Sequence, residues 1–168
     1  MSAEPSAAIV RPATAADLAA VGRLGALLVR LHHDFDPARF IPAAPRTEER
    51  YASYLGSQLG QRDIVVLVAE REGMVLGYSY AGIEGYDYMS LRGPAGILYD
   101  IVVDPAQRKR GVGRQLLEAT VAALAQRGAP RVVLSTAERN ETAQRLFADA
   151  GFRRTMIEMT RELSGGAP

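Results

Sequence analysis

Residues 97–124 place a strand, a glycine-containing turn and a helix in immediate succession, and no other stretch constrains the fold as strongly. The strand is apolar and ends before Pro105, which has no N–H to donate to a β-ladder. An amphipathic helix follows, with apolar residues recurring at helical spacing. A strand that leads directly into a helix is typical of layered α/β domains. The turn between them contains Gln107, Arg108, Lys109, Arg110, Gly111, Val112 and Gly113.

The turn and the helix start together have the properties of an anion-binding site. The first N–H groups of a helix lack partners inside it and carry the positive end of its dipole. Gly111 and Gly113 let a phosphate approach the backbone closely, because no Cβ stands in the way. Arg114 and the basic residues of the turn add long-range attraction. We therefore expect a phosphorylated ligand beside the end of the strand.

Two common phosphate-binding motifs do not fit this turn. A Rossmann loop needs a third glycine where the chain has Leu116, and a P-loop needs a Gly-Lys-Ser/Thr sequence that the chain lacks. Nucleic-acid binding favours basic residues interleaved with exposed aromatic residues, and the turn has none. The net charge of +1 gives no general attraction to nucleic acids or membranes. We expect neither as a partner.

The length of 168 residues suits one domain with one core. We expect residues 9–163 to form this domain, with a disordered tail at 1–8 and a second tail at 164–168. The first residues lack the basic start and apolar run of a signal peptide, and no segment approaches the ~20 apolar residues that span a bilayer. Without cysteine, the chain offers no disulfide and no thiolate metal ligand. A cytoplasmic protein without a metal is the expectation.

Hydrophobic periodicity predicts the order of strands and helices. Thr14 can cap the first helix, with Asp17 in the position of a capping box. Glu72 and Gly73 form a hairpin turn signal between two strands. The predicted strands span residues 9–12, 64–69, 74–84, 97–104, 131–136 and 152–163, and the predicted helices span residues 15–32, 47–60, 111–127 and 140–150.

This order predicts an α/β fold with one mixed sheet. The three central strands, joined by short connections, should be antiparallel. The strand, helix and strand between residues 97 and 136 should form a right-handed parallel crossover. We expect a mixed, mostly antiparallel sheet of about six to seven strands with helices on both faces.

The chain resembles the GNAT family of acyl-CoA-dependent N-acyltransferases over nearly its whole length. Residues 108–113 are similar to the family's Arg/Gln-x-x-Gly-x-Gly/Ala pyrophosphate loop, at the expected distance from a strand. Downstream, Asn140, Ala143 and residues 147–152 resemble the family's Asn…Ala…Leu-Tyr-x-x-x-Gly-Phe segment. The two matches together, in this order of elements, are specific.

The resemblance implies acetyl-CoA as the acyl donor. In the family, strand backbone groups hold the pantetheine arm, and one amide polarises the thioester carbonyl, an effect that can be worth about 3 kcal/mol. The strands at Asp100 and Ser135 should separate to admit the cofactor. The residues implied in cofactor binding are Ile101, Val102, Val103, Arg108, Lys109, Arg110, Gly111, Val112, Gly113, Arg114, Asn140 and Phe147.

Two positions depart from the family pattern. Where the family often has a tyrosine, assigned as the acid that protonates the leaving thiolate, this chain has Phe147, which has no proton to give. Tyr78, Tyr80, Tyr99 or solvent would then serve as the proton donor, and the sequence does not choose among them. Ser135 stands where some peptide-acetylating members carry a carboxylate, which argues against that substrate class.

Transfer to an amine also needs a base, because an ammonium cannot attack the thioester. Asp100 is the best-placed candidate, in mid-strand among apolar neighbours, and a structural carboxylate is the alternative. Glu84 on the adjacent strand is the second candidate, and a water relay from either remains open.

Aromatic residues supply the candidates for the acceptor site. Tyr86 and Tyr88 lie in a polar, glycine-flanked stretch, where a core role is less natural than substrate binding. Tyr78 and Tyr80 are candidates on the preceding strand, and Phe35 lies in the segment that follows the first helix. His32 and His33 are adjacent and so do not share a helix face, which argues against metal chelation and leaves an exposed helix end or an acceptor-site lid.

We therefore expect an N-acetyltransferase that moves an acetyl group from acetyl-CoA to a primary amine of a small molecule by direct attack. The chain has no cysteine and no evident activated serine, so no covalent intermediate is expected. Two alternatives remain at this point: a weakly catalytic or non-catalytic acyl-CoA-binding module, and acetylation of a protein or peptide amine. Family members often dimerise through C-terminal strands, so a homodimer is a further expectation.

Overall fold

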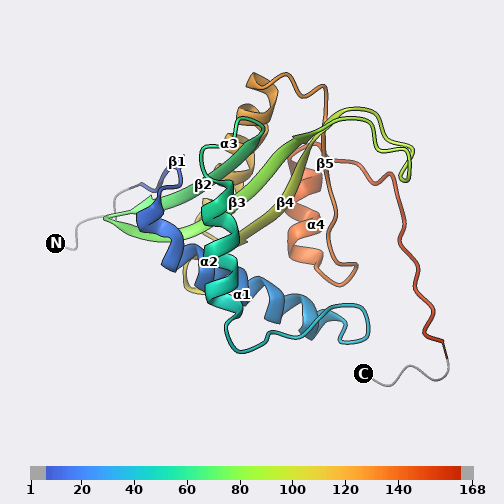
Figure 1. The fold of residues 1–168 in the computed structure, drawn as a ribbon, viewed down its shortest axis with the longest axis horizontal. Coiled ribbons are helices and arrows are strands. Elements are labelled where there is room, and N and C mark those ends of the chain that lie inside the picture. Colours follow the sequence, from blue (N-terminus) through green and yellow to red (C-terminus); the bar gives the residue numbers. More distant parts are fainter. Residues whose placement is uncertain (1–6, 164–168) are drawn as a thin grey trace.

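A computed structural model describes residues 7–163 as a single mixed sheet with helices on both faces (Figure 1). Most of the predicted 1–8 tail and all of residues 164–168 lie outside the described part. The strands lie in the order β1-β2-β3-β4-β5, with β4 and β5 parallel and the other neighbours antiparallel. The strands are β1 (Ile9–Pro12), β2 (Ile64–Arg71), β3 (Met74–Glu84), β4 (Ala95–Val103) and β5 (Val132–Leu134).

Four α-helices and two short 3₁₀ turns complete the domain. The helices are α1 (Leu18–Phe35), α2 (Thr47–Gln58), α3 (Val112–Gln126) and α4 (Glu141–Asp149), and the 3₁₀ turns are η1 (Ala15–Asp17) and η2 (Pro105–Gln107). The capping box predicted at Thr14 forms, since its backbone N–H donates to the Asp17 carboxylate at 2.8 Å. The predicted hairpin turn also forms, with positive φ at both Glu72 and Gly73.

The side chains of the strands divide the core between the two faces of the sheet. On one face, Tyr78, Tyr80 and Val102 pack with residues of α1 and α2. On the other, Leu76 and Leu98 pack against α3, whose buried residues are Val112, Leu116, Leu117, Thr120 and Leu124. The predicted mixed α/β fold is therefore confirmed.

The predicted number of strands was too high. The described part of the chain has a five-stranded sheet, and residues 152–163, predicted as a last strand, form none. This segment runs away from the sheet beyond α4 (Figure 1) and leaves Met156, Ile157 and Met159 more than three-quarters exposed. Loose alternation was a poor guide, because a strand also needs a neighbour to pair with. The first helix ends at Phe35, beyond the predicted His32.

Helices α1 and α2 approach each other at glycine residues. A Cβ at Gly25 would lie 2.2 Å from ring atom Cδ1 of Tyr51, and one at Gly22 would lie 2.5 Å from the carbonyl oxygen of Glu48. Only glycine therefore permits this close approach, which brings Tyr51 over α1.

Gly25→Ala is expected to lower the free energy of unfolding by about 1–3 kcal/mol, because the methyl group would overlap the Tyr51 ring and force it to shift. Chemical denaturation measures the change. Gly56→Ala on α2 is the control, since its methyl would meet only the flexible end of Leu18, at 3.0 Å. In a helix interior alanine is otherwise about 1 kcal/mol better than glycine, so a stabilised Gly25→Ala variant would contradict the close contact.

Candidate active site

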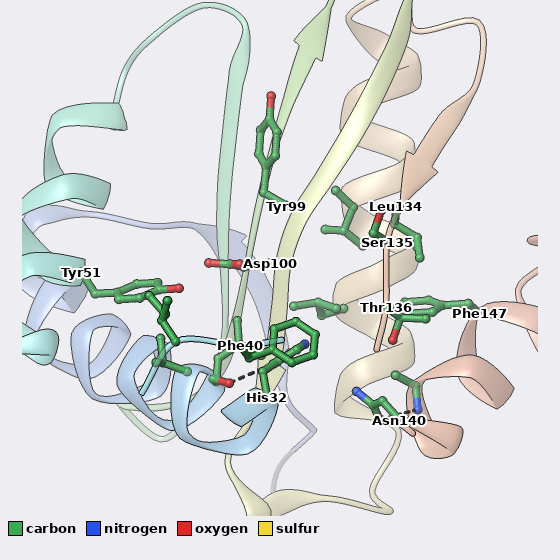
Figure 2. Close-up of a pocket in the computed structure, with 16 residues that line it drawn as sticks. His32, Phe40, Tyr51, Tyr99, Asp100, Leu134, Ser135, Thr136, Asn140 and Phe147 are labelled. Carbon is green, nitrogen blue, oxygen red and sulfur yellow. Dashed lines mark hydrogen bonds between the residues drawn. The ribbon is translucent and has the colours of Figure 1, made fainter. Parts of the chain in front are cut away.

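The site begins where β4 and β5 separate. Their parallel pairing ends at Leu98 and Leu134, although β4 continues to Val103. A cavity of about 280 Å³ opens at this point. Figure 2 shows its labelled side chains in two groups, with His32, Phe40, Tyr51 and Asp100 on one side of β4 and Ser135, Asn140 and Phe147 on the other. The predicted separation of the strands at Asp100 and Ser135 is therefore present.

A β-bulge in β4 shapes the cavity wall. Asp100 is opposite Tyr80 and Leu98 is opposite Ala81, so Tyr99 is an extra residue without a partner on β3. The Tyr99 ring lies 4.8 Å from that of Tyr80, which belongs to the core on the α1 side. Consecutive residues of a regular strand point to opposite faces. The bulge instead brings Tyr99 and Asp100 to the same face.

Beyond the bulge, β4 presents a free edge to the cavity. The amide of Asp104 donates to Leu76 in β3 at 2.8 Å, so by alternation the amides of Ile101 and Val103 point away from β3. That edge faces the side where β5 lies, and β5 pairs only as far as Leu98. Two strand amides are thus positioned to bind an extended ligand as an added strand.

Asp100 is a largely buried carboxylate in the wall of the cavity. It accepts a hydrogen bond from the Tyr78 hydroxyl at 3.0 Å. Burial raises the pKa of Asp100, and the Tyr78 bond and the charge of His32 oppose that rise only in part. Burial and the charge of Asp100 also raise the pKa of Tyr51 to about 12. The cavity therefore combines one carboxylate with tyrosines that stay protonated.

Glu84, the other predicted base, lies in a separate network. Its carboxylate accepts from the Tyr99 hydroxyl at 2.6 Å and from Arg92 at 2.7 Å. It does not line the cavity, whereas Tyr99 does. Burial, and then the bond to Glu84, raises the pKa of Tyr99. With its carboxylate already bound to Tyr99 and Arg92, Glu84 is a poor candidate for the base.

The basic turn leads into the N-terminus of α3, as the sequence predicts. Gly111 is the N-cap with φ 77°, and no side chain caps the helix there. The side chains of Arg108, Lys109 and Arg110 are exposed around these amides. Arg114 is also exposed, but its guanidinium pairs with Glu118 at 2.8 Å. The turn therefore offers backbone amides and three cations, with Arg114 partly neutralised.

The remaining predicted cofactor residues divide between the cavity and the core. Asn140 lines the cavity, and its side-chain oxygen caps α4 by accepting from the Ala143 amide at 3.2 Å. Phe147 is buried and lines the cavity on the α4 side. Val102 is buried on the α1 side, and Val112, the first residue of α3, is buried in the core on the opposite face of the sheet.

Most of the predicted acceptor residues lie outside the cavity. Tyr86 and Tyr88 stack on each other at 6.0 Å in the β3–β4 loop, and both are highly exposed. Tyr78 and Tyr80 are buried beneath the site, where they bond Asp100 and Tyr54, respectively. Phe35 is the last residue of α1 and contacts His32 without lining the cavity.

A sequence model of the Acetyltransferase (GNAT) family matches residues 28–152, which is most of the chain. The chain belongs to this family. The resemblance seen in the turn and the downstream segment is thus confirmed, and the free edge of β4 lies within the matched region of this GNAT protein.

Similarity to known proteins extends to sequence and to fold. Mycothiol acetyltransferase from Thermobispora bispora is 36% identical over 96 residues, which cover 55% of this GNAT protein and 31% of that relative. The chain thus spans about a third of the length of this curated relative. A mutant of the BH1408 protein from Bacillus halodurans has the same fold, with a TM-score of 0.77 and 22% identity over 92% of this chain and 99% of that one. An aminoglycoside N-acetyltransferase in complex with CoA has a TM-score of 0.70 and 20% identity, over 98% and 99% of the two chains.

Several cavity residues of this GNAT protein carried no decisive signal in the sequence. His32 and His33 have the same two interpretations in the sequence, and Tyr51 lies in the predicted helix at 47–60 without a motif around it. Phe40 and Ile41 lie in the segment between α1 and α2, whose apolar content indicated only that it packs on something. A wall built from α1, this segment and α2 depends on tertiary packing, which periodicity does not encode.

Two further observations concern the described residues alone. Among residues 7–163, no helix is long and apolar enough to cross a membrane. The same residues contain no cluster of three or more His, Asp or Glu side chains arranged to hold a metal ion.

Proposed function

We propose that this protein transfers an acetyl group from acetyl-CoA to a primary amine of a small molecule. One observation carries the proposal: the free edge of β4 and the partly buried carboxylate of Asp100 meet in one cavity. Strand amides suit the pantetheine arm and the thioester carbonyl, and the carboxylate suits a cationic amine. The family match and the CoA complex of a protein with the same fold support the donor.

We assign the two substrates to opposite sides of β4. The pyrophosphate would lie on the amides at the start of α3, with the pantetheine along Ile101 and Val103. The acceptor would enter between α1, α2 and the 36–46 segment, where Asp100 attracts its ammonium group. Both reactants then reach the bulge, and attack of the amine on the thioester carbon expels the CoA thiolate.

The character of the cavity supports a small acceptor. Its volume of about 280 Å³ and the aromatic rings of Phe40, Tyr51 and Tyr99 suit a compact amine with some apolar surface. One relative is named a mycothiol acetyltransferase and one structural neighbour an aminoglycoside N-acetyltransferase, and both names refer to small molecules. Ser135, at a position where some peptide-acetylating members have a carboxylate, argues against a peptide acceptor.

Release of CoA thiol, measured across a panel of primary amines with acetyl-CoA, tests the function directly. We expect turnover with at least one small amine and none with acetyl-CoA alone. Tight binding of acetyl-CoA without turnover on any amine would instead favour a non-catalytic acyl-CoA-binding module. The observation that favours this second function is Phe147, because a phenylalanine cannot donate a proton to the leaving thiolate.

Phe147→Tyr is expected to raise kcat, because a hydroxyl on this ring would provide the proton donor that the cavity wall lacks there. Phe147→Leu is the control, since it changes the ring without adding a donor. Steady-state kinetics with saturating acetyl-CoA measure both variants. A large loss of kcat in Phe147→Tyr would show that the leaving thiolate lies elsewhere.

A further inference from the structure

His32 is the cavity residue to which the function proposed above gives no role. It lies in the last turn of α1 and lines the same cavity as Asp100 (Figure 2). Its Nδ1 lies 2.9 Å from the carbonyl oxygen of Leu28. A carbonyl only accepts, so this contact assigns the proton of the neutral ring to Nδ1 and leaves the lone pair on Nε2. One ring nitrogen is anchored, and the other has no hydrogen-bond partner among residues 7–163.

Aromatic contacts hold the ring in this orientation. Phe35 packs edge-to-face on His32, with ring centroids 6.0 Å apart and an interplanar angle of 84°. Phe40 packs on it at 5.0 Å and 69°. The imidazole is therefore positioned from both sides and needs little reorganisation before it accepts a proton.

Several charged and titratable groups surround the ring. Asp100 on β4 interacts electrostatically with His32, and Tyr51 on α2 lines the same cavity. His33 is the neighbour on α1, and its Nδ1 bonds the Phe40 carbonyl oxygen at 2.8 Å. In the 36–46 segment, the Arg39 guanidinium lies 4.9 Å from the centre of the Phe40 ring. The carboxylate is the group in this set that stabilises a transient imidazolium.

We propose that His32 is the general base of the acetyl transfer, while Asp100 binds the acceptor's ammonium group. This role rests on the proposed acetyltransferase function. Nε2 removes one proton from the ammonium, and the free amine attacks the thioester carbon. The C–N bond forms and the C–S bond breaks, with the electron pair leaving on the CoA sulfur. The amide nitrogen gives its second proton to the thiolate, directly or through water, and the imidazolium returns its own to solvent.

His32→Gln tests the role, because the glutamine amide can still donate to the Leu28 carbonyl but cannot act as a base. We expect kcat to fall about a hundredfold, within the usual contribution of a positioned base. Acetyl-CoA affinity, measured by calorimetry, should stay unchanged and also report that the variant is folded. His33→Gln is the matched control: it alters an adjacent histidine with a similar carbonyl bond outside the cavity lining, and it should keep the wild-type pH profile. His32→Asn repeats the test if the glutamine variant does not fold.

A series of acceptor amines separates a base from a residue that only shapes the cavity. Weakly basic amines are already unprotonated at neutral pH, so the defect of His32→Gln should shrink as acceptor basicity falls. A merely structural role would give the same defect for every amine and would overturn the proposal, as would wild-type kcat in His32→Gln. If the wild-type protein turned over no amine at all, the acetyltransferase function itself would fail together with this role.

Discussion

Asp100→Asn is expected to lower kcat/KM for the amine about a thousandfold, because removing one partner of a buried charge pair costs about 3–5 kcal/mol. Asparagine keeps the shape of the side chain and can still accept from Tyr78, but it offers no charge to an ammonium. The loss should therefore lie mainly in KM for the amine, with acetyl-CoA affinity unchanged. Asp63→Asn, at an exposed carboxylate before β2, is the control and should behave as wild type.

The same substitution is expected to stabilise the fold at neutral pH. Burial raises the pKa of Asp100, so the folded protein binds this proton more tightly than the unfolded chain does. Stability from this group is therefore fully present below the ordinary Asp pKa and is lost as pH rises through the raised value. Asparagine does not ionise, so Asp100→Asn removes this pH-dependent loss of folding stability. Thermal melts of both proteins should differ at neutral pH and converge in acid, and a wild-type protein that is the more stable at neutral pH would contradict this assignment.

Gly111→Val is expected to weaken acetyl-CoA binding about a thousandfold, equivalent to two or more charge-assisted hydrogen bonds at ~1.5–3 kcal/mol each. Gly111 has φ 77°, a conformation that a β-branched residue avoids, so the turn must move and its amides lose their common direction. Calorimetric titration with acetyl-CoA measures the change.

Gly128→Val is a matched control for this effect. Gly128 follows α3 at its other end with φ 85°, and neither glycine has an atom within 4 Å of its would-be Cβ. The two variants should therefore lose similar stability, about 1–2 kcal/mol for a non-glycine residue in this conformation. Only Gly111→Val should lose affinity. Equal affinities would place the pyrophosphate away from this turn.

The fold and the donor side of the site follow from local sequence. The basic turn, the glycine N-cap of α3 and the apolar strand before it are consecutive, so their order alone places them together. The acceptor side could not be predicted in the same way. His32, Phe40 and Tyr51 come from three separate segments, and they meet because glycines let α1 and α2 pack closely. Tyr86 and Tyr88 were predicted as acceptor residues but do not line the cavity. Their polar surroundings indicated correctly that both side chains are exposed, but exposure does not place them at the cavity.

The bulge at Tyr99 adds one residue to β4, and regular pairing with β3 continues on both sides of it. Omitting Tyr99 from the count leaves Leu98, Asp100 and Ile101 in regular alternation, so the extra residue changes neither the core face nor the free edge. Its side chain nevertheless lines the cavity on the side proposed for the acceptor, where its hydroxyl bonds Glu84. A substitution at position 99 is therefore expected to change this wall while the free edge of β4 stays where it is. Such a position lets acceptor preference diverge among descendants of one fold without a loss of the underlying reaction.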